Sequence, residues 1–145
     1  HEGDLGLKMF KALAQALDSG RRPALVLGSD SPTLPPAHID ALTRFDTDVS
    51  LGPTEDGGYY AIAAQRVDCR MFDGVRWSTR HALNDTLRSC VVCGLTTSVG
   101  PYWFDVDCAA DVERLRGCRT LRRHACKALK TPDWCKNPAE ESKPA

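Results

Sequence analysis

An uninterrupted apolar run at residues 24–28 is the feature that most constrains the fold of this chain. An amphipathic pattern precedes it, with apolar residues at three- and four-residue spacing from Leu5 to Leu17 and Gly20 at its end. That pattern predicts a helix. A short apolar run between turn residues is typical of a central strand that is covered on both faces of its sheet. We therefore expect a helix followed by a buried strand.

Helical and strand patterns continue to alternate along the chain. Apolar residues at 39–45 predict a second helix, with prolines in its first turn and Thr33 or Leu34 at its cap position. Strands are predicted at residues 49–52 and 59–64. They are expected to form a hairpin, because the six residues between them are too few for a crossover helix.

The second half of the chain adds two helices and one weaker strand. Ser78 is the predicted N-cap of a helix that Gly94 ends, and a strand is predicted at residues 95–99. A last helix carries Val112 and Leu115. This alternation predicts an α/β fold with a mixed sheet, because the hairpin makes one strand antiparallel.

Composition narrows the function classes. The 145 residues correspond to one domain, and 19 basic against 19 acidic residues leave no net charge. Nonspecific nucleic-acid binding is therefore not expected. The longest apolar run, residues 59–64, is far shorter than the roughly 20 residues of a membrane span. Seven scattered cysteines favour a reducing, cytoplasmic setting, and the one close pair, Cys90 and Cys93, has no second pair to complete a zinc site.

Two acidic turns fall where strands are expected to end, and ligands of open α/β sheets bind at such ends. Asp30 follows the run at 24–28, and its carboxylate either binds a divalent metal or caps the following turn. Asp105 and Asp107 are two positions apart, so in extended backbone their carboxylates point the same way. Asp107 is also a candidate helix cap. The residues alone leave these alternatives open.

Two further segments have chemical potential. Residues 55–58 read Glu-Asp-Gly-Gly, which is typical of a hairpin turn. Here the glycines are expected to leave backbone N–H groups open to a ligand, and Asp56 or Glu55 is a candidate general base. At residues 77–80, Trp-Ser-Thr-Arg predicts either a packed aromatic followed by a cap, or a stacking face and a cation for a sugar or phosphate.

Taken together, these segments resemble a family in order and spacing. They read GSDSPTLP at 28–35, LGPTEDGGYY at 51–60, WST at 77–79 and WFDVD at 103–107, and GDLG at 3–6 is similar to a further segment of that family. The family is that of bacterial GT-A-type glycosyltransferases formerly of unknown function, of the arsenosugar-biosynthesis type. It is related to the molybdenum-cofactor and coenzyme F420 nucleotidyltransferases. The resemblance covers residues 1–117.

The resemblance implies a nucleotide-diphospho-sugar transferase fold, in which a Rossmann-like mixed sheet is sandwiched by helices. It implies a Mg²⁺ or Mn²⁺ ion held by Asp30, Asp105 and Asp107. Glu55 and Asp56 match the acceptor-side turn as candidate general bases. The substrate-binding residues are expected to be Ser29, Gly57, Gly58, Trp77, Ser78 and Thr79. The partners are a nucleotide-sugar donor and a small-molecule acceptor.

Members of that family begin with a strand and a basic loop that grips the nucleotide diphosphate, and no such segment occurs in these residues. We therefore expect an N-terminally truncated transferase domain at 1–117, either cut from a longer protein or degenerate. A basic helical extension is predicted at 118–130 and a disordered tail at 131–145. The basic residues at 114–130 form either a solvated face or a docking surface for a phosphate-rich partner. Nucleotidyl transfer and a noncatalytic binding domain remain the alternative functions.

Overall fold

The computed structural model describes residues 3–116, so the predicted extension at 118–130 and tail at 131–145 lie outside the described residues. The chain divides into two compact units, the first ending at Asp107 and the second beginning at Cys108. Seven elements belong to the first unit: α1 (Gly3–Asp18), β1 (Ala24–Leu27), α2 (Pro36–Arg44), β2 (Val49–Pro53), β3 (Tyr59–Ala64), α3 (Ala82–Val92) and β4 (Thr97–Val99). In the second unit, the described residues form α4 (Ala109–Arg116).

The four strands form one mixed sheet in the order β1-β3-β2-β4. β3 runs antiparallel to both β1 and β2, whereas β2 and β4 are parallel. The predicted hairpin is confirmed, with Leu51 opposite Ile62 and a register shift at Gly52/Pro53 next to the turn.

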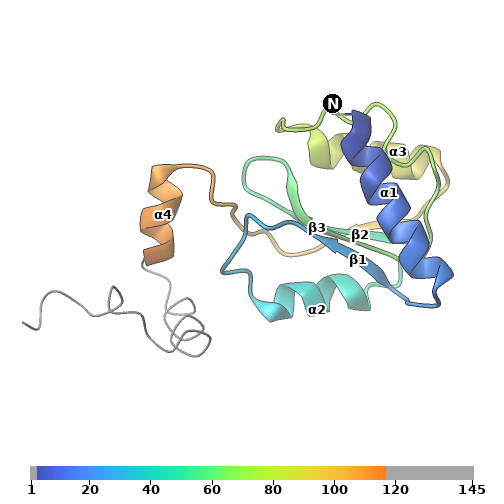
Figure 1. Cartoon of the computed structure of the whole chain (residues 1–145), viewed down its shortest axis with the longest axis horizontal. Coiled ribbons are helices and arrows are strands. Elements are labelled where there is room, and N and C mark those ends of the chain that lie inside the picture. The colour runs from blue at the N-terminus through green and yellow to red at the C-terminus, as the bar shows by residue number, and fades with distance from the viewer. Residues whose placement is uncertain (1–2, 117–145) are drawn as a thin grey trace, which may run out of the picture. The chain divides into compact units, whose positions relative to one another are not determined.

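Helices cover both faces of this sheet, as Figure 1 shows with α1 and α3 on one side and α2 on the other. Alternation along β3 explains the two layers, since successive side chains of a strand point to opposite faces. Ile62 packs in the core with α1 and α3, whereas Ala61 and Ala63 pack with Leu42 of α2. The predicted α/β fold with a mixed sheet between helices is confirmed.

The prediction of a central position for the first strand is wrong. Within the described part of the chain, β1 pairs with β3 alone, and Leu25 and Leu27 are 38% and 53% exposed. An apolar run reports how hydrophobic a strand is, and it carries no information on how many strands flank it.

Two predicted helix caps are also wrong. α2 begins at Pro36 with Pro35 at its N-cap and no side-chain cap, so neither Thr33 nor Leu34 serves. Ser78 is not an N-cap, because its φ of 56° is left-handed and α3 begins only at Ala82. The predicted end of α3 at Gly94 is confirmed, where φ is 71° and the Gly94 N–H donates to the Val91 carbonyl. None of the helices among the described residues has the length and apolar character that crossing a bilayer requires.

Candidate functional site

A cavity of about 660 Å³ opens where β1 ends, between that strand, the β2–β3 turn and the loop before α3. Nine of the eleven predicted site residues line it, and they come from four separate segments: Ser29, Asp30, Asp56, Gly58, Trp77, Ser78, Thr79, Asp105 and Asp107. Glu55 and Gly57 do not line the cavity. The structure therefore brings together side chains that lie up to 78 positions apart in the sequence, Ser29 and Asp107 being the furthest.

The two acidic turns are joined by direct hydrogen bonds. The Val106 N–H donates to the carbonyl oxygen of Asp30 at 2.8 Å. The hydroxyl of Ser31 donates to Oδ1 of Asp105, and that of Ser29 donates to Oδ1 of Asp30 at 2.9 Å. Ser31 is buried, so its bond holds the Asp105 carboxylate in one orientation. Both turns consequently form one rim of the cavity.

Negative charge accumulates at this rim. Partial burial raises the pKa of the Asp105 carboxyl above its ordinary value, and the charges of Asp56, Asp107 and Asp30 raise it further. The hydrogen bond from Ser31 acts in the opposite direction. A rise of this origin means that the ionised form of Asp105 is disfavoured first by burial and then by the neighbouring charges. A cation at the rim would relieve that repulsion.

The donor chemistry of the rim fits a hard divalent cation. Carboxylate oxygens are the ligands that Mg²⁺ and Mn²⁺ prefer. Across residues 3–116, however, no three His, Cys, Asp or Glu side chains are arranged as a ready-made metal centre. Asp30, Asp105 and Asp107 thus share a cavity without forming a complete ligand set by themselves.

The β2–β3 turn uses its polar groups internally. Oδ1 of Asp56 accepts hydrogen bonds from the Thr54 hydroxyl and, at 3.1 Å, from the Gly58 N–H. The Gly57 N–H donates to the Thr54 carbonyl at 3.2 Å. The expectation that both glycines leave their N–H groups open to a ligand is therefore wrong, because both N–H groups donate hydrogen bonds within the turn. Asp56 still lines the cavity, held by its own turn.

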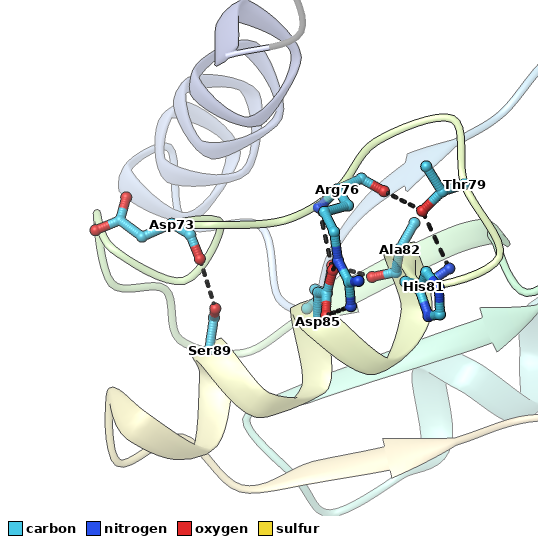
Figure 2. A network of polar contacts seen from close by, with 8 residues as sticks. Asp73, Arg76, Thr79, His81, Ala82, Asp85 and Ser89 are labelled. Atoms are coloured by element: carbon cyan, nitrogen blue, oxygen red, sulfur yellow. Dashed lines mark hydrogen bonds and ion pairs between the residues drawn. The ribbon is translucent and has the colours of Figure 1, made fainter.

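The loop before α3 forms another wall of the cavity and is braced by the hydrogen bonds in Figure 2. Trp77 is only 7% exposed and packs on Phe72 and Tyr59, with ring centroids 5.8 and 6.3 Å apart. It is thus mainly a packed core aromatic that also borders the cavity. Ser78 and Thr79 are exposed beside it.

This loop and the first turn of α3 contact the β2–β3 turn directly. The Leu83 N–H donates to the Gly57 carbonyl at 3.1 Å. A Cβ at position 57 would lie 2.2 Å from the Arg80 carbonyl oxygen, so only glycine allows this approach. The requirement for glycine at position 57 is therefore close packing of two loops, together with its φ of 92°.

Sequence reasoning missed the apolar wall of the cavity. It includes Leu5 and Met9 from α1 and Val26 and Leu27 from β1. The spacing of Leu5 and Met9, four residues apart on an amphipathic helix, is the signal that places them on one face. Leu5 is nevertheless 45% exposed, so this wall is open to solvent.

The other thiol and cavity that could have functional roles offer fewer reactive groups. Cys90 is buried, and burial raises the pKa of its thiol to about 12, which keeps it protonated and unreactive. A second cavity of about 460 Å³ is bordered by Gly6, Cys69, Asp73 and Trp77, among others. It contains none of the acidic side chains of the rim.

Comparison with known proteins bears on the family and the fold of the chain. The model of a family described as "Uncharacterized protein conserved in bacteria (DUF2064)" matches residues 1–79. A crystal structure of a "putative nucleotide-diphospho-sugar transferase" from Desulfovibrio desulfuricans G20 superimposes with a TM-score of 0.71 at 28% sequence identity. That match covers 82% of this chain and spans 55% of the length of the solved one. No curated protein matches the chain.

Proposed function

This chain belongs to the bacterial DUF2064 family, and on that premise we propose that it carries the acidic side chains of a metal-dependent glycosyltransferase site. The donor would be a nucleotide-diphospho-sugar and the acceptor a small molecule with a nucleophilic hydroxyl. The similar protein from Desulfovibrio desulfuricans supports the donor class. The single observation that carries the proposal is that Asp30 and the Asp105/Asp107 pair line one cavity.

Asp30, Asp105 and Asp107 would hold the cation, Mg²⁺ or Mn²⁺, together with oxygens of the donor diphosphate. Such an ion supplies Lewis-acid stabilisation of the charge that grows on the departing nucleoside diphosphate. The protein's own contribution is to fix the carboxylates. Ser31 orients Asp105, and the Val106 N–H keeps the two turns together.

The acceptor would enter beside the β2–β3 turn. Asp56 is the better general base of the two candidates, because it lines the cavity whereas Glu55 does not. Its Oδ1 is occupied by Thr54 and Gly58, which leaves Oδ2 to orient a hydroxyl and accept its proton. Thr54 is fully buried, so its hydroxyl anchors this carboxylate rigidly.

Turnover of the intact protein tests this proposal. Asp30→Ala is expected to lower the rate roughly a thousandfold, since losing about 4 kcal/mol of charge stabilisation costs a factor of ten per 1.4 kcal/mol. The matched control is Asp46→Ala, which removes an exposed carboxylate that does not line the cavity and should leave turnover unchanged. Near-normal turnover of Asp30→Ala would contradict the assignment.

The product identifies the reaction. A glycosyltransferase releases a nucleoside diphosphate, whereas a nucleotidyltransferase acting on a nucleoside triphosphate releases pyrophosphate. Phosphorus NMR of the reaction mixture separates the two products. Failure of nucleotide-sugars to bind in the presence of Mn²⁺ would instead indicate a noncatalytic domain.

A further inference from the structure

Asp85 is a buried carboxylate that neither the core nor the proposed reaction uses directly. It lies in the first turn of α3 and is 7% exposed. Arg76 satisfies it with three hydrogen bonds, from the backbone N–H at 3.2 Å, from Nε at 2.8 Å and from Nη2 at 2.9 Å (Figure 2). A two-pronged guanidinium–carboxylate pair is both strong and specific in geometry. Asp85 therefore fixes the main chain as well as the side chain of Arg76.

Arg76 is the first residue of a closed loop. Its carbonyl accepts a hydrogen bond from the Thr79 hydroxyl at 2.8 Å, and that hydroxyl accepts one from the His81 N–H at 3.2 Å. The Ala82 N–H then donates to the Thr79 carbonyl at 3.1 Å, which returns the chain to α3. Asp85 thus holds one end of the loop on the same helix from which the other end departs.

The loop needs such a hold because part of it is unfavourable on its own. Ser78 has a φ of 56°, a left-handed conformation that residues other than glycine rarely adopt. Ser78 and Thr79 are exposed at the cavity, so packing does not hold them as it holds Trp77. Surrounding hydrogen bonds must therefore maintain their conformation.

We propose that Asp85 is a positioning residue that, through Arg76, holds Ser78 and Thr79 in place at the cavity wall. The inference rests on the proposed function and adds to it that this wall contacts the nucleotide part of the donor. The proposed effect of Asp85 extends to the β2–β3 turn, because Leu83, two residues before Asp85, donates its N–H to the Gly57 carbonyl. Loss of Asp85 would loosen both walls at once.

The test compares Asp85→Asn with Asp68→Asn in the intact protein. Asp68 also makes a two-pronged pair, with Arg70, but that pair lies outside residues 76–85, which carry the hydrogen-bond network of Asp85. Two measurements are made: hydrogen exchange of the amides at residues 77–83, and titration with Mn²⁺ plus UDP or GDP. Asp85→Asn is expected to speed the exchange of these amides and to weaken nucleotide binding about tenfold, since small misplacements of a binding wall cost one to two orders of magnitude. Asp68→Asn should change neither.

A milder variant guards against loss of folding. Arg76→Lys keeps the backbone hydrogen bond to Asp85 and the positive charge but loses the two-pronged geometry, so an intermediate effect on both measurements is expected. Arg76 is a partly exposed side chain, and its replacement leaves the core intact.

The outcomes separate the two proposals. A wild-type protein that binds neither nucleotide would overturn the proposed function, while the exchange data would still report whether Asp85 orders the loop. Unchanged exchange in Asp85→Asn would overturn the positioning role. Faster exchange with unchanged nucleotide affinity would show that the loop is ordered by Asp85 but makes no contribution to binding, which also overturns it.

Discussion

At the scale of single residues, opposing interactions act on the ionised form of Asp105. Burial and the charges of Asp30, Asp56 and Asp107 disfavour its ionised form, whereas Ser31 donates a hydrogen bond to it. Binding sites commonly retain such unfavourable charge because a ligand later compensates it, and removing the charge then stabilises the protein at the expense of function. Such a cost is consistent with the proposal that this rim binds a cation.

Asp105→Asn should therefore raise the melting temperature at pH 7 when divalent cations are absent. Because the pKa of Asp105 is higher in the folded state than in the unfolded chain, the folded state loses stability as pH rises through that range. The advantage of the asparagine variant should accordingly shrink as the pH falls toward 3.8, the ordinary value for aspartate, where Asp105 of the wild type becomes protonated. Circular dichroism melts between pH 4 and pH 7 measure this difference.

Asp46→Asn serves as the control, since it removes an exposed charge that does not line the cavity. An Asp105→Asn variant that melts below the wild type at pH 7 would mean that the Ser31 hydrogen bond to a charged oxygen outweighs the repulsion.

At the scale of elements, the docking of the β2–β3 turn on the loop before α3 decides the shape of the cavity. Gly57 makes this contact, with φ of 92° and no room for a Cβ beside the Arg80 carbonyl. Gly74 also has a left-handed φ, 71°, but a Cβ there would meet nothing within 4 Å. The two glycines therefore share a left-handed backbone conformation, but only Gly57 contacts another loop, so Gly74 is a matched control for Gly57.

Gly74→Ala is expected to cost about 1–2 kcal/mol of unfolding free energy, the usual penalty for an L-residue in a left-handed conformation. Gly57→Ala should exceed this by at least about 1 kcal/mol, because the turn must also move away from Arg80. Urea denaturation measures both values. Equal losses for the two variants would argue that the turn and the loop are not docked in solution.

At the scale of elements, some features of the fold could be predicted from the sequence and others could not. Periodicity predicted α1, and the short spacing between two apolar runs predicted the β2–β3 hairpin, because these signals are local. The cap at Ser78 was mispredicted because the sequence does not mark where α3 begins, and the residues before Ala82 form a loop in which Ser78 has a left-handed φ. The burial of Asp85 and its pairing with Arg76 could not be read from the sequence, since one acidic residue in the first turn of a helix is ordinarily solvent-exposed and interacts with the helix dipole.

At the scale of the whole molecule, the sheet order explains why distant acidic turns meet. β1 and β2 run in the same direction on either side of β3, so the segments that follow them leave the sheet at the same end, beyond the carboxyl ends of both strands. The Thr54–Trp103 bridge then brings the residues after β4 alongside the end of β2, ahead of Asp105. The order of the motifs along the sequence was enough to predict that the acidic turns meet. The position of β1 at the edge of the sheet was not predictable, because it depends on strand pairing that no local pattern encodes.

Because the cavity is built from five segments spread across the first unit, a ligand that binds there should stabilise the entire folded unit and have no counterpart site in the unfolded chain. Linkage then predicts about 2.7 kcal/mol of added stability when Mn²⁺ and the nucleotide diphosphate are present at a hundred times the dissociation constant. Thermal melts of the intact protein should show this gain, lose it when EDTA removes the cation, and show none in Asp30→Ala, while Asp46→Ala behaves as the wild type. A gain from the nucleotide that survives EDTA would instead mean that the phosphates are bound without a cation, so that the acidic rim would have to face the acceptor.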